Sequence, residues 1–517
     1  MTFSDNEIQE IKKHGLTQEI VESQVDLFVN GVPNVELVAA ATVGDGIYKL
    51  SDKQQADYVT AYQKSMGDKK IVKFIPASGA ASRMFKSVFQ FLDEYDSTKE
   101  TLQEYFDRTG DDFMKHFFDN LQQFPFYRKV NDILKKEYSE GKLADKNFKA
   151  RKFVEVVMGS DHLNFGGLPK GLLPFHDYNA YAATAFEEHL YEAETYAATD
   201  GKAILHFTVS PEHKEGFEKH FKEIGTSISN LTGIKYDVSY SFQKPETDTV
   251  AVTPENKLFR KADGSMLFRP GGHGALIENL NDVDGDVIFI KNIDNVLVRD
   301  DVPLLAHYKK ILGGMLLKLE TTVFEYLSAL ENDTFKEDNL PELEKFLTED
   351  FSTKLDSYYK ELPFGEKKSF LYDLLHRPIR ICGMVKNEGE PGGGPFWVKD
   401  SSGKTALQII ESAQVNEDDA AQQDIFQDST HFNPVDVVCS VKDHNGKSYD
   451  LLDFVNRDLS FIASKTLDGK PLKALELPGL WNGAMAKWNT LFVEVPVETF
   501  NPVKTVNDLL KPSHQVK

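Results

Sequence analysis

A glycine-rich turn and a carboxylate lie close together in the sequence between residues 268 and 295. The turn precedes an expected helix start at 275–280, and Asp294 follows an apolar strand expected at 287–291. Glycines ahead of a helix let backbone N–H groups approach an anion or a base edge, because no Cβ stands in the way. A carboxylate just past the carboxyl end of a strand lies where open α/β sheets bind ligands, and its oxygens suit a hard cation. The pair predicts a nucleotide with Mg²⁺, whereas either half alone is also explained as a turn or a loop. The turn residues are Gly271, Gly272, His273 and Gly274.

A second pattern that suits an anion follows the first expected strand, at 70–76. Small side chains let a phosphate approach the backbone, and an arginine can pair with phosphate through two hydrogen bonds. The alternative is a tight turn with a surface arginine. A rigid loop at 166–175 presents a further cation, Lys170. The residues of the first loop are Ser78, Gly79, Ala80, Ala81, Ser82 and Arg83.

Alternating strands and helices are expected to hold these segments. Apolar runs predict strands at 70–76, 203–209, 236–242 and 287–291, with helices at 180–197 and 211–224. This β-α-β alternation indicates a largely parallel sheet. The predicted fold class is therefore α/β, with a Rossmann-like, mixed but mostly parallel central sheet. Shorter strands are expected at 405–414, 436–441 and 490–495, and Trp481 and Trp488 are expected to pack in the core.

Helical segments flank the sheet in the expected domain organisation. Helical spacing of apolar residues predicts an N-terminal helical layer at 1–69, an insertion at 87–157 and a segment covering the sheet at 302–376. The nucleotide-binding part of the core is expected at 70–86 and 158–301, and its C-terminal part at 377–517. Residues 377–398 are expected to form a second glycine-dense loop.

Composition limits the classes of function and the compartment. The 517 residues include 59 basic and 81 acidic residues, for a net charge of −22, which argues against non-specific binding of nucleic acid or of an anionic membrane. An anionic substrate would need locally placed cations. The two cysteines, Cys382 and Cys439, make a disulfide framework or a cysteine zinc site implausible and fit a reducing compartment. With no apolar signal core at the start and no run as long as a membrane span, the protein is expected to be cytoplasmic. The sequence does not indicate an oligomeric state.

Several segments resemble, in the same order, those of the UDP-sugar pyrophosphorylases, nucleotidyltransferases of the glycosyltransferase-A-like fold; the chain resembles a divergent, bacterial-type branch of them. The resemblance covers most of the chain from Ile71 to Leu510 in pieces. SFQKPETDT resembles the segment with a base-contacting glutamine, RPGGHGAL the nucleotide turn and FIKNIDN the strand that ends in a metal-binding aspartate. QIIESAQV and STHFNPVD resemble the sugar-side strand and the Phe-Asn segment, and TFNPVKTVNDLL resembles a segment whose lysine contacts phosphate.

The resemblance implies a role for each candidate residue. Arg83 and Lys170 would neutralise the leaving pyrophosphate, and Lys504 would hold the attacking phosphate. The first loop, Gln243 and the turn Gly272, His273, Gly274 would bind the nucleotide, Asp294 would bind Mg²⁺, and Gly393, Glu411 and Asn433 would face the sugar. The first loop departs from the family, because Pro169-Lys170 follows Arg83 only after the expected helical insertion. That insertion would then lie inside the signature loop, where it could act as a lid or a partner surface.

The implied reaction is Mg²⁺-dependent transfer of a nucleotidyl group from a nucleoside triphosphate, by resemblance UTP, to a sugar 1-phosphate. Such transfers depend on positioning and charge neutralisation rather than on covalent participation of the protein. Two alternatives remain: a glycosyltransferase that uses a nucleotide sugar, and a non-catalytic module for nucleotide binding or interaction. The sequence leaves the sugar and the base open.

Overall fold

The structure is a computed structural model that describes residues 3–332, 334–389, 392–400 and 403–517. It divides into two compact units, each built from several stretches of the chain. Unit 1 consists of Met1–Phe74, Ser241–Ile290 and Tyr308–Val497, and unit 2 of Ile75–Tyr240, Lys291–His307 and Glu498–Lys517. The domain ranges expected from the sequence follow other bounds and stay predictions.

Unit 1 contains the larger part of the sheet, in the strand order β2-β3-β19-β13-β16-β12-β4. Among the described residues of this unit, four neighbouring pairs are parallel and two, on either side of β16, are antiparallel. The predicted α/β class with a mixed, mostly parallel sheet is therefore confirmed. The strands are β2 (Thr42–Val43), β3 (Gly46–Tyr48), β19 (Asn489–Glu494), β13 (Ile379–Lys386), β16 (His431–Ser440), β12 (Val287–Ile290) and β4 (Ile71–Pro76), whose last two residues belong to unit 2.

The central strand β12 carries an unbroken apolar run, VIFI, whereas β16 is buried throughout although it includes His431, Asn433 and Asp436. Every residue of β12 and β16 is buried. Strands covered on both faces read as continuous apolar segments rather than as an alternation. β4 and β12 pair in parallel, with Ile71 opposite Val287 and Phe74 opposite Ile290. Their carboxyl ends therefore lie next to each other, and both lead into loops that carry candidate residues.

The first 69 residues differ from the expected helical layer. Three helices form as expected, but the strands β1 (Glu36–Ala40), β2 and β3 lie between the second and third helices. This segment, ELVAAATVGDGIY, has no clear apolar periodicity, and its short strands complete two sheets rather than a helix. The helices are α1 (Asp5–Lys13), α2 (Gln18–Asn30) and α3 (Asp52–Ser65).

Residues 377–398 also differ from the expectation, because two strands occupy most of the predicted glycine-dense loop. They are β13 and β14 (Gly394–Lys399); residues 390 and 391 lie outside the described part. Two of the described glycines, Gly383 and Gly394, lie within these strands and serve close packing there. A Cβ on Gly394 would lie 2.7 Å from the Ser429 hydroxyl oxygen.

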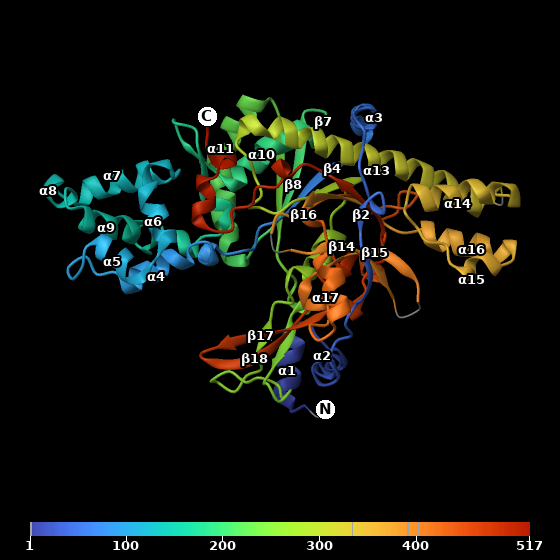
Figure 1. Cartoon of the computed structure of the whole chain (residues 1–517), viewed down its shortest axis with the longest axis horizontal. Coiled ribbons are helices and arrows are strands. Elements are labelled where there is room, and N and C mark those ends of the chain that lie inside the picture. Colours follow the sequence, from blue (N-terminus) through green and yellow to red (C-terminus); the bar gives the residue numbers. More distant parts are fainter. Residues whose placement is uncertain (1–2, 333, 390–391, 401–402) are drawn as a thin grey trace. The chain divides into compact units, whose positions relative to one another are not determined.

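Two smaller sheets and a set of helices complete unit 1. The first sheet has the order β1-β14-β15, and the second has the order β11-β10-β18-β17. Most of residues 302–376 are helical (Figure 1), and the expectation that this segment covers the sheet stays a prediction. The strands are β15 (Thr405–Ile410), β10 (Thr249–Val252), β11 (Phe268–Arg269), β17 (Phe461–Leu467) and β18 (Lys470–Glu476), and the helices are α12 (Ile277–Asn281), α13 (Val302–Glu331, which starts in unit 2), α14 (Leu340–Glu349), α15 (Ser357–Glu361), α16 (Phe364–Leu375) and α17 (Ala420–Gln427).

Unit 2 places two helices beside a short sheet. Strand β8 pairs with β7 and β9, and β5 and β6 form a hairpin that leads into α10. Thr184 caps α10 by accepting a hydrogen bond from the backbone N–H of Glu187. The elements are β5 (Pro174–Asp177), β6 (Ala182–Thr184), α10 (Ala185–Tyr196), β7 (Ala198–Thr199), β8 (Lys202–Thr208), α11 (Lys214–Thr232) and β9 (Lys235–Ser241).

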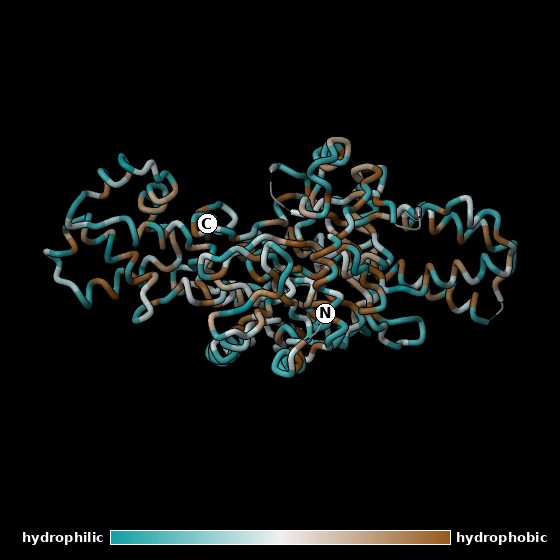
Figure 2. The backbone as a smooth tube through the Cα atoms, turned by 90° about the horizontal axis from the view of Figure 1, so that it is seen from below, coloured by the Kyte–Doolittle hydropathy of each residue, from teal (hydrophilic) through white to brown (hydrophobic). Residues whose placement is uncertain are grey.

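Six helices follow the first loop and form a helical subdomain within unit 2 (Figure 1). Apolar and polar segments alternate along these helices (Figure 2), as amphipathic helices require. Their common core is aromatic, and the rings of Phe91 and Tyr105 meet edge to face at 5.2 Å. The helices are α4 (Lys86–Glu94), α5 (Leu102–Thr109), α6 (Asp112–Asp119), α7 (Tyr127–Glu137), α8 (Glu140–Leu143) and α9 (Lys146–Met158).

Within the described ranges, none of the helices combines the length and the apolar character that crossing a bilayer requires.

Candidate functional site

The first loop and Lys170 are neighbours in unit 2 despite the helical subdomain between them in sequence. Ala80 and Pro169 form an antiparallel bridge. The backbone N–H of Ala81 donates to the carbonyl of Leu168 at 3.0 Å, and that of Lys170 donates to the carbonyl of Gly79 at 3.3 Å. The helices therefore form an excursion out of one continuous loop, as the resemblance implied.

Asp294 reaches the same place from the end of β12. The backbone N–H of Ile293 donates to the carbonyl of Pro76, 3.2 Å away at the end of β4. Lys170 Nζ lies 2.7 Å from Asp294 Oδ2 and also donates to the carbonyl of Val503 at 2.8 Å. The two side chains are only 16% and 18% exposed, so the ion pair is largely shielded from water.

The C-terminal tail brings Lys504 to this cluster. The backbone N–H of Val503 donates to the carbonyl of Asp294 at 3.1 Å, and that of Val506 donates to the carbonyl of Met84 at 3.2 Å. Arg83 and Lys504 are both exposed, and among the residues that the structure describes neither forms an ion pair. Arg83, Lys504 and the pair of Lys170 with Asp294 therefore lie on backbone segments of unit 2 that are hydrogen-bonded together.

Buried polar residues of α10 contact the segment that carries Asp294. Lys291 Nζ lies 2.8 Å from Glu192 Oε2, with each side chain 1% exposed. His189 Nε2 lies 3.2 Å from the carbonyl oxygen of Ile293. The sequence analysis did not single out these residues. Their signal was present in the run EEHLYEAE, which places charged residues on a helix face that is buried.

A second buried network fixes the tail that carries Lys504. His176 contacts Glu188 Oε1 through Nδ1 at 2.9 Å and His514 Nδ1 through Nε2 at 3.0 Å. Glu188 Oε2 lies 3.4 Å from Nε of Arg299. Burial, with a smaller contribution from neighbouring His176, lowers the pKa of His514 to about 3. His514 is therefore neutral at neutral pH, as its enclosed position requires.

Most residues of the first loop are exposed to solvent. Ser78, Gly79, Ala80 and Ser82 are exposed. Ala81 is buried and its N–H is already donated to Leu168, so Ala81 contributes no free N–H for a phosphate. A Cβ on Gly79 would meet no atom within 4 Å, so protein neighbours do not explain that glycine.

The glycine turn in unit 1 is explained in large part by packing of backbone against backbone. A Cβ on Gly271 would lie 2.6 Å from the carbonyl oxygen of Thr247, and one on Gly274 only 2.1 Å from that of Pro478. Gly272 has a φ of +80°, which favours glycine. Thr247 belongs to the segment that contains half-buried Gln243, so the base-side segment and the turn are in contact.

His273 lies against residues that the sequence analysis did not connect to it. Its ring stacks on Trp481 at 4.3 Å and 14°, so Trp481 does not simply fill the core as expected, whereas Trp488 is 4% exposed and does. The backbone N–H of Leu480 donates to His273 Nδ1 at 3.0 Å. Burial lowers the pKa of His273 against the opposing charges of Glu411 and Glu476.

The predicted sugar-side residues gather beside this turn. Glu411 Oε1 lies 3.8 Å from His273 Nε2 and accepts a hydrogen bond from Asn482 Nδ2 at 2.6 Å. A Cβ on Gly393 would lie 3.4 Å from Cγ of Glu411, and the backbone N–H of Asn433 donates to the carbonyl of Gly393 at 2.8 Å. Unit 1 therefore brings together the turn, Gly393, Glu411 and Asn433.

Asn433 lies on a strained part of β16. Val435, two residues on, has a φ of +60°, an unusual value for a β-branched residue. Its N–H donates to Asn433 Oδ1 at 3.0 Å. Asn433 Nδ2 and Asn482 Oδ1 are buried without a hydrogen-bond partner in the described part of the chain. A buried unpaired donor and acceptor suit a polar ligand.

The donor set tests whether a metal fits. In the described ranges, no three side chains of His, Cys, Asp or Glu group together as a metal site. Asp436 pairs with buried Lys309. Asp294 offers one carboxylate. That set suits Mg²⁺, which proteins often hold through one or two carboxylates together with substrate phosphates.

The chain matches one family model and resembles solved structures at low sequence identity. A family model described as "Domain of unknown function (DUF4301)" matches residues 4–515, and no curated protein matches. A mutant UDP-glucose pyrophosphorylase from Leishmania major is similar at 12% identity, with a TM-score of 0.45, over 98% of this chain and 79% of that one. The uridine diphosphate N-acetylglucosamine pyrophosphorylase from Trypanosoma brucei is similar at 11% identity, with a TM-score of 0.47, over 95% and 74%. A UDP-glucose phosphorylase from the same organism is similar at 13% identity, with a TM-score of 0.44, over 98% and 77%.

Proposed function

Because the chain belongs to the DUF4301 family, a domain of unknown function, we propose its function from its own residues. We propose that it is a nucleotidyltransferase. It would transfer a nucleotidyl group from a nucleoside triphosphate to a sugar 1-phosphate, forming a nucleoside-diphosphate sugar and pyrophosphate. UTP is the expected triphosphate because of the motif resemblance.

One observation carries the proposal: four segments far apart in sequence meet at the ends of β4 and β12. They contribute the first loop, Lys170, Asp294 and Lys504, joined by hydrogen bonds of 2.7 to 3.3 Å. Although the protein has a net charge of −22, these hydrogen-bonded segments carry three cations, Arg83, Lys170 and Lys504. Such an arrangement suits a polyphosphate, whose transfer depends on positioning and charge neutralisation.

The cationic residues of unit 2 would neutralise the phosphate groups of the two substrates. An oxygen of the sugar 1-phosphate attacks the α-phosphorus, and the bond from that phosphorus to the oxygen bridging the β-phosphate breaks. Arg83 and Lys170 would neutralise the charge that develops on the departing pyrophosphate. Lys504 would hold the attacking phosphate, and the exposed amides of the first loop would orient the triphosphate.

Lys170 must exchange partners for this to happen. In the structure its Nζ is bound to Asp294, and in the proposal it turns to phosphate while Asp294 becomes the protein ligand of Mg²⁺. When bound, the ion would neutralise phosphate charge and orient the oxygens. Because Lys170 also contacts the carbonyl of Val503, the exchange involves the tail that carries Lys504.

The residues of unit 1 would recognise the base and the sugar. The side-chain amide of Gln243 has a donor and an acceptor with which to read a base edge. Gly272, His273 and Gly274 would support the nucleotide, and Gly393, Glu411 and Asn433 would contact the sugar. The unpaired Nδ2 of Asn433 is a suitable donor for a sugar hydroxyl.

The deciding experiment measures pyrophosphate release from UTP and Mg²⁺ with a panel of sugar 1-phosphates. Release that depends on one sugar 1-phosphate supports the proposal. Absence of release with every sugar contradicts it and favours a transferase or a binding module. Thermal shift separates these outcomes further, because a ligand that binds the folded state raises Tm. Stabilisation by UTP without turnover indicates the non-catalytic module.

A further inference from the structure

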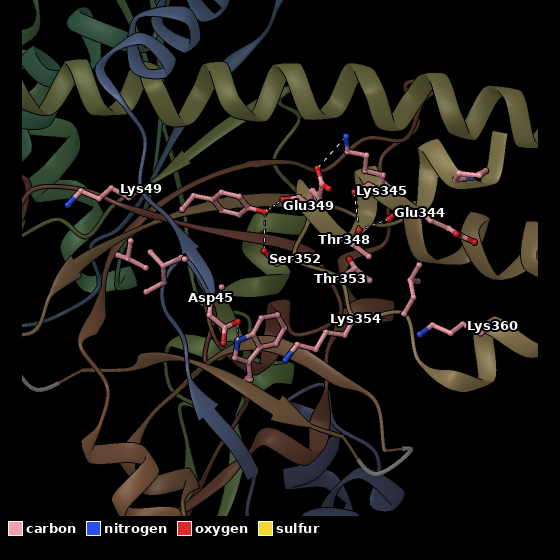
Figure 3. A pocket seen from close by; sticks show the side chains of 18 residues that line it. Asp45, Lys49, Glu344, Lys345, Thr348, Glu349, Ser352, Thr353, Lys354 and Lys360 are labelled. Carbon is pink, nitrogen blue, oxygen red and sulfur yellow. Dashed lines mark hydrogen bonds and ion pairs between the residues drawn. The ribbon is translucent and has the colours of Figure 1, made fainter. Parts of the chain in front are cut away.

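A large open pocket lies in unit 1, and none of the candidate residues lines it. Its volume is about 990 Å³, within the range of small-molecule sites. Its walls come from the turn between β2 and β3, from the segment around the end of α14, and from β14. Figure 3 shows the side chains that line it, including Asp45, Lys49, Lys345, Lys354 and Lys360.

The carboxylates of the pocket already have partners in its walls. Asp45 Oδ1 accepts a hydrogen bond from Trp397 Nε1 at 3.0 Å, and Glu344 Oε1 accepts one from the Tyr359 hydroxyl at 2.8 Å. Glu349 faces Lys345 at 3.8 Å on the exposed side of α14. Each carboxylate is thus oriented by a partner, and the three carboxylates are outnumbered by the four lysines of the lining, although the protein as a whole is strongly acidic.

Two of the lysines differ from the others in having no carboxylate partner. Lys49 pairs with Glu494 at 2.9 Å, and Lys345 pairs with Glu349. Lys354 and Lys360 line the same pocket, and within the described stretches neither forms an ion pair. Both lie in the lower part of the view in Figure 3. Two unneutralised ammonium groups at one cavity create a local site for an anion.

Lys354 is also held by an aromatic ring. Its Nζ lies 3.7 Å from the ring centre of Trp397, close enough for a cation–π contact. Trp397 itself is 3% exposed and fixed by Asp45. The ammonium group is therefore positioned rather than free on a surface chain. With Ile47, Leu355 and Pro341 nearby in the lining, apolar surface adjoins the charge.

Hydroxyl groups and a constrained backbone complete the pocket. Ser352 has a φ of +50°, a left-handed conformation for a residue other than glycine. It contacts the Tyr48 hydroxyl at 3.0 Å, and Tyr48 also donates to the carbonyl of Glu349. The loop that carries Thr353 and Lys354 is thereby tied to β3. The Thr353 hydroxyl also lines the pocket and adds a hydrogen-bond donor for a phosphate oxygen.

We propose that this pocket binds a small organic phosphate, with the phosphate group held by Lys354 and Lys360 and the organic body lying along the apolar wall. This inference does not rest on the proposed function, because all lining residues lie in unit 1 and none belongs to the phosphate-side cluster of unit 2. The chemistry that recognises the ligand is a phosphate with an attached body, and a nucleotide or a sugar phosphate can supply it.

One contact suggests a consequence of binding. Glu494, the partner of Lys49, also faces His431 Nε2 with its other oxygen at 3.5 Å. His431 begins β16, the strand that carries Asn433. A phosphate that competes for Lys49 would change the charge opposite His431, two residues from Asn433.

The test is titration calorimetry of the full chain with inorganic pyrophosphate, glucose 1-phosphate and ATP. The pocket variant carries Lys354→Gln and Lys360→Gln, which remove charge and keep the stems. A matched control is Lys470→Gln, an exposed lysine on β18 without an ion pair in the described part of the chain. A second comparison carries Arg83→Gln and Lys504→Gln in unit 2.

We expect the pocket variant to bind glucose 1-phosphate or ATP at least about tenfold more weakly at this site, with one fewer bound ligand per chain, while Lys470→Gln behaves as wild type. The phosphate-side variant should keep this site, so failure of the proposed function and failure of this inference give different results. Unchanged stoichiometry and affinity in the pocket variant for all three probes would overturn the proposal. Pocket binding of pyrophosphate alone would overturn the assignment of an organic body.

Two further measurements keep the result interpretable. Lys360→Gln alone leaves the contact between Lys354 and Trp397 intact, so it provides the test if the double variant loses its fold by circular dichroism. Trp397 adjoins the site, and ligand binding should therefore change tryptophan fluorescence. In the Lys360→Gln variant the half-maximal change should need several-fold more ligand than in the wild type, and an unshifted titration curve would contradict the role of Lys360.

Discussion

The two sets of candidate residues differ in how fully their polar groups are already satisfied. In unit 2 the cations Arg83 and Lys504 are exposed and unpaired within the described residues, and Lys170 is held by Asp294 alone among carboxylates. In unit 1 the side chains of His273, Glu411 and Asn482 contact one another. The first set suits a ligand whose charge must be neutralised, and the second suits one recognised by shape and hydrogen bonds.

This difference indicates which part must rearrange on binding. A lysine–aspartate pair that is less than a fifth exposed has to open before either partner can meet phosphate or metal. The stacked and hydrogen-bonded residues of unit 1 need no such exchange. Pre-formed contacts lower the ordering cost of binding, so we expect sugar and base recognition to be more rigid than phosphate binding.

The largest expected effect comes from removing the carboxylate of Asp294 in unit 2. Asp294→Ala should lower turnover in the pyrophosphate assay by at least about 100-fold, because the Mg²⁺ that would neutralise the reacting phosphate loses its protein ligand. Asp300→Ala removes a nearby exposed carboxylate and should leave turnover unchanged. Wild-type turnover of Asp294→Ala with Mg²⁺ present would contradict the metal assignment.

A second variant tests whether the Lys170 pair is structural as well as functional. Lys170→Met leaves Asp294 without its partner in a shielded place and should destabilise the fold by about 1 to 3 kcal/mol, discounted from the cost of a fully buried pair. The pair of Lys202 with Asp237, with side chains 44% and 55% exposed at 2.8 Å, is the control, because Lys202→Met should cost about 0.5 kcal/mol or less. Chemical denaturation measures the loss of unfolding free energy in the two variants. Equal losses would show that shielding from water does not raise the cost of breaking the ion pair.

The pH dependence of stability tests the network that anchors the Lys504 tail. The pKa of His514 is about 3 in the fold and about 6.5 when unfolded, so the unfolded chain binds more protons between these values. Stability should therefore fall as pH decreases from about 6.5 toward 3, by up to about 1.4 kcal/mol per pH unit from this group. His176, Glu188, Asp508 and Lys511 surround it.

The variant His514→Gln supplies the control for that slope. It removes the titrating group, so the fall in unfolding free energy between pH 6.5 and 4.5 should become shallower than in the wild type. An identical slope in both proteins would assign the acid sensitivity to other groups.

The smallest expected effect lies in unit 1. Trp481→Leu removes the ring stacked on His273 and should cost about 0.5 to 1.5 kcal/mol beyond the lost area, measured by denaturation. The KM for the sugar 1-phosphate should rise more than kcat falls, because His273 loses the ring on which it stacks and Glu411 lies beside His273. A larger fall in kcat than rise in KM would place Trp481 on the side of the chemistry.

The sequence predicted those parts of the fold whose signals are local. The apolar runs of β4 and β12 and the helices of the insertion stand as expected, because burial on both faces and helical spacing are visible in single segments. The strands β13 and β14 were missed because glycines that serve close packing look like loop glycines. Strands β1 to β3 were missed because short edge strands have little periodicity.

In the candidate site, too, the sequence predicted only what local signals reveal. The order of motifs indicated that Lys170 belongs with the first loop, but only the bridge between Ala80 and Pro169 places it there. Buried partners such as Glu192 for Lys291 depend on contacts between distant segments, and neither residue type nor spacing reveals which carboxylate meets which cation. Trp481 was assigned to the core because aromatic residues usually are.

The joined ends of the helical excursion have a consequence for how the protein tolerates change. The chain leaves beside Ala81 and returns at Leu168, and these residues share a hydrogen bond of 3.0 Å, so the excursion has a closed neck. Lengthening a loop whose ends are already fixed adds little closure entropy. The helices could therefore be shortened, exchanged or grafted with another domain while the neck keeps its geometry, and a protease cut inside them should leave the two fragments associated.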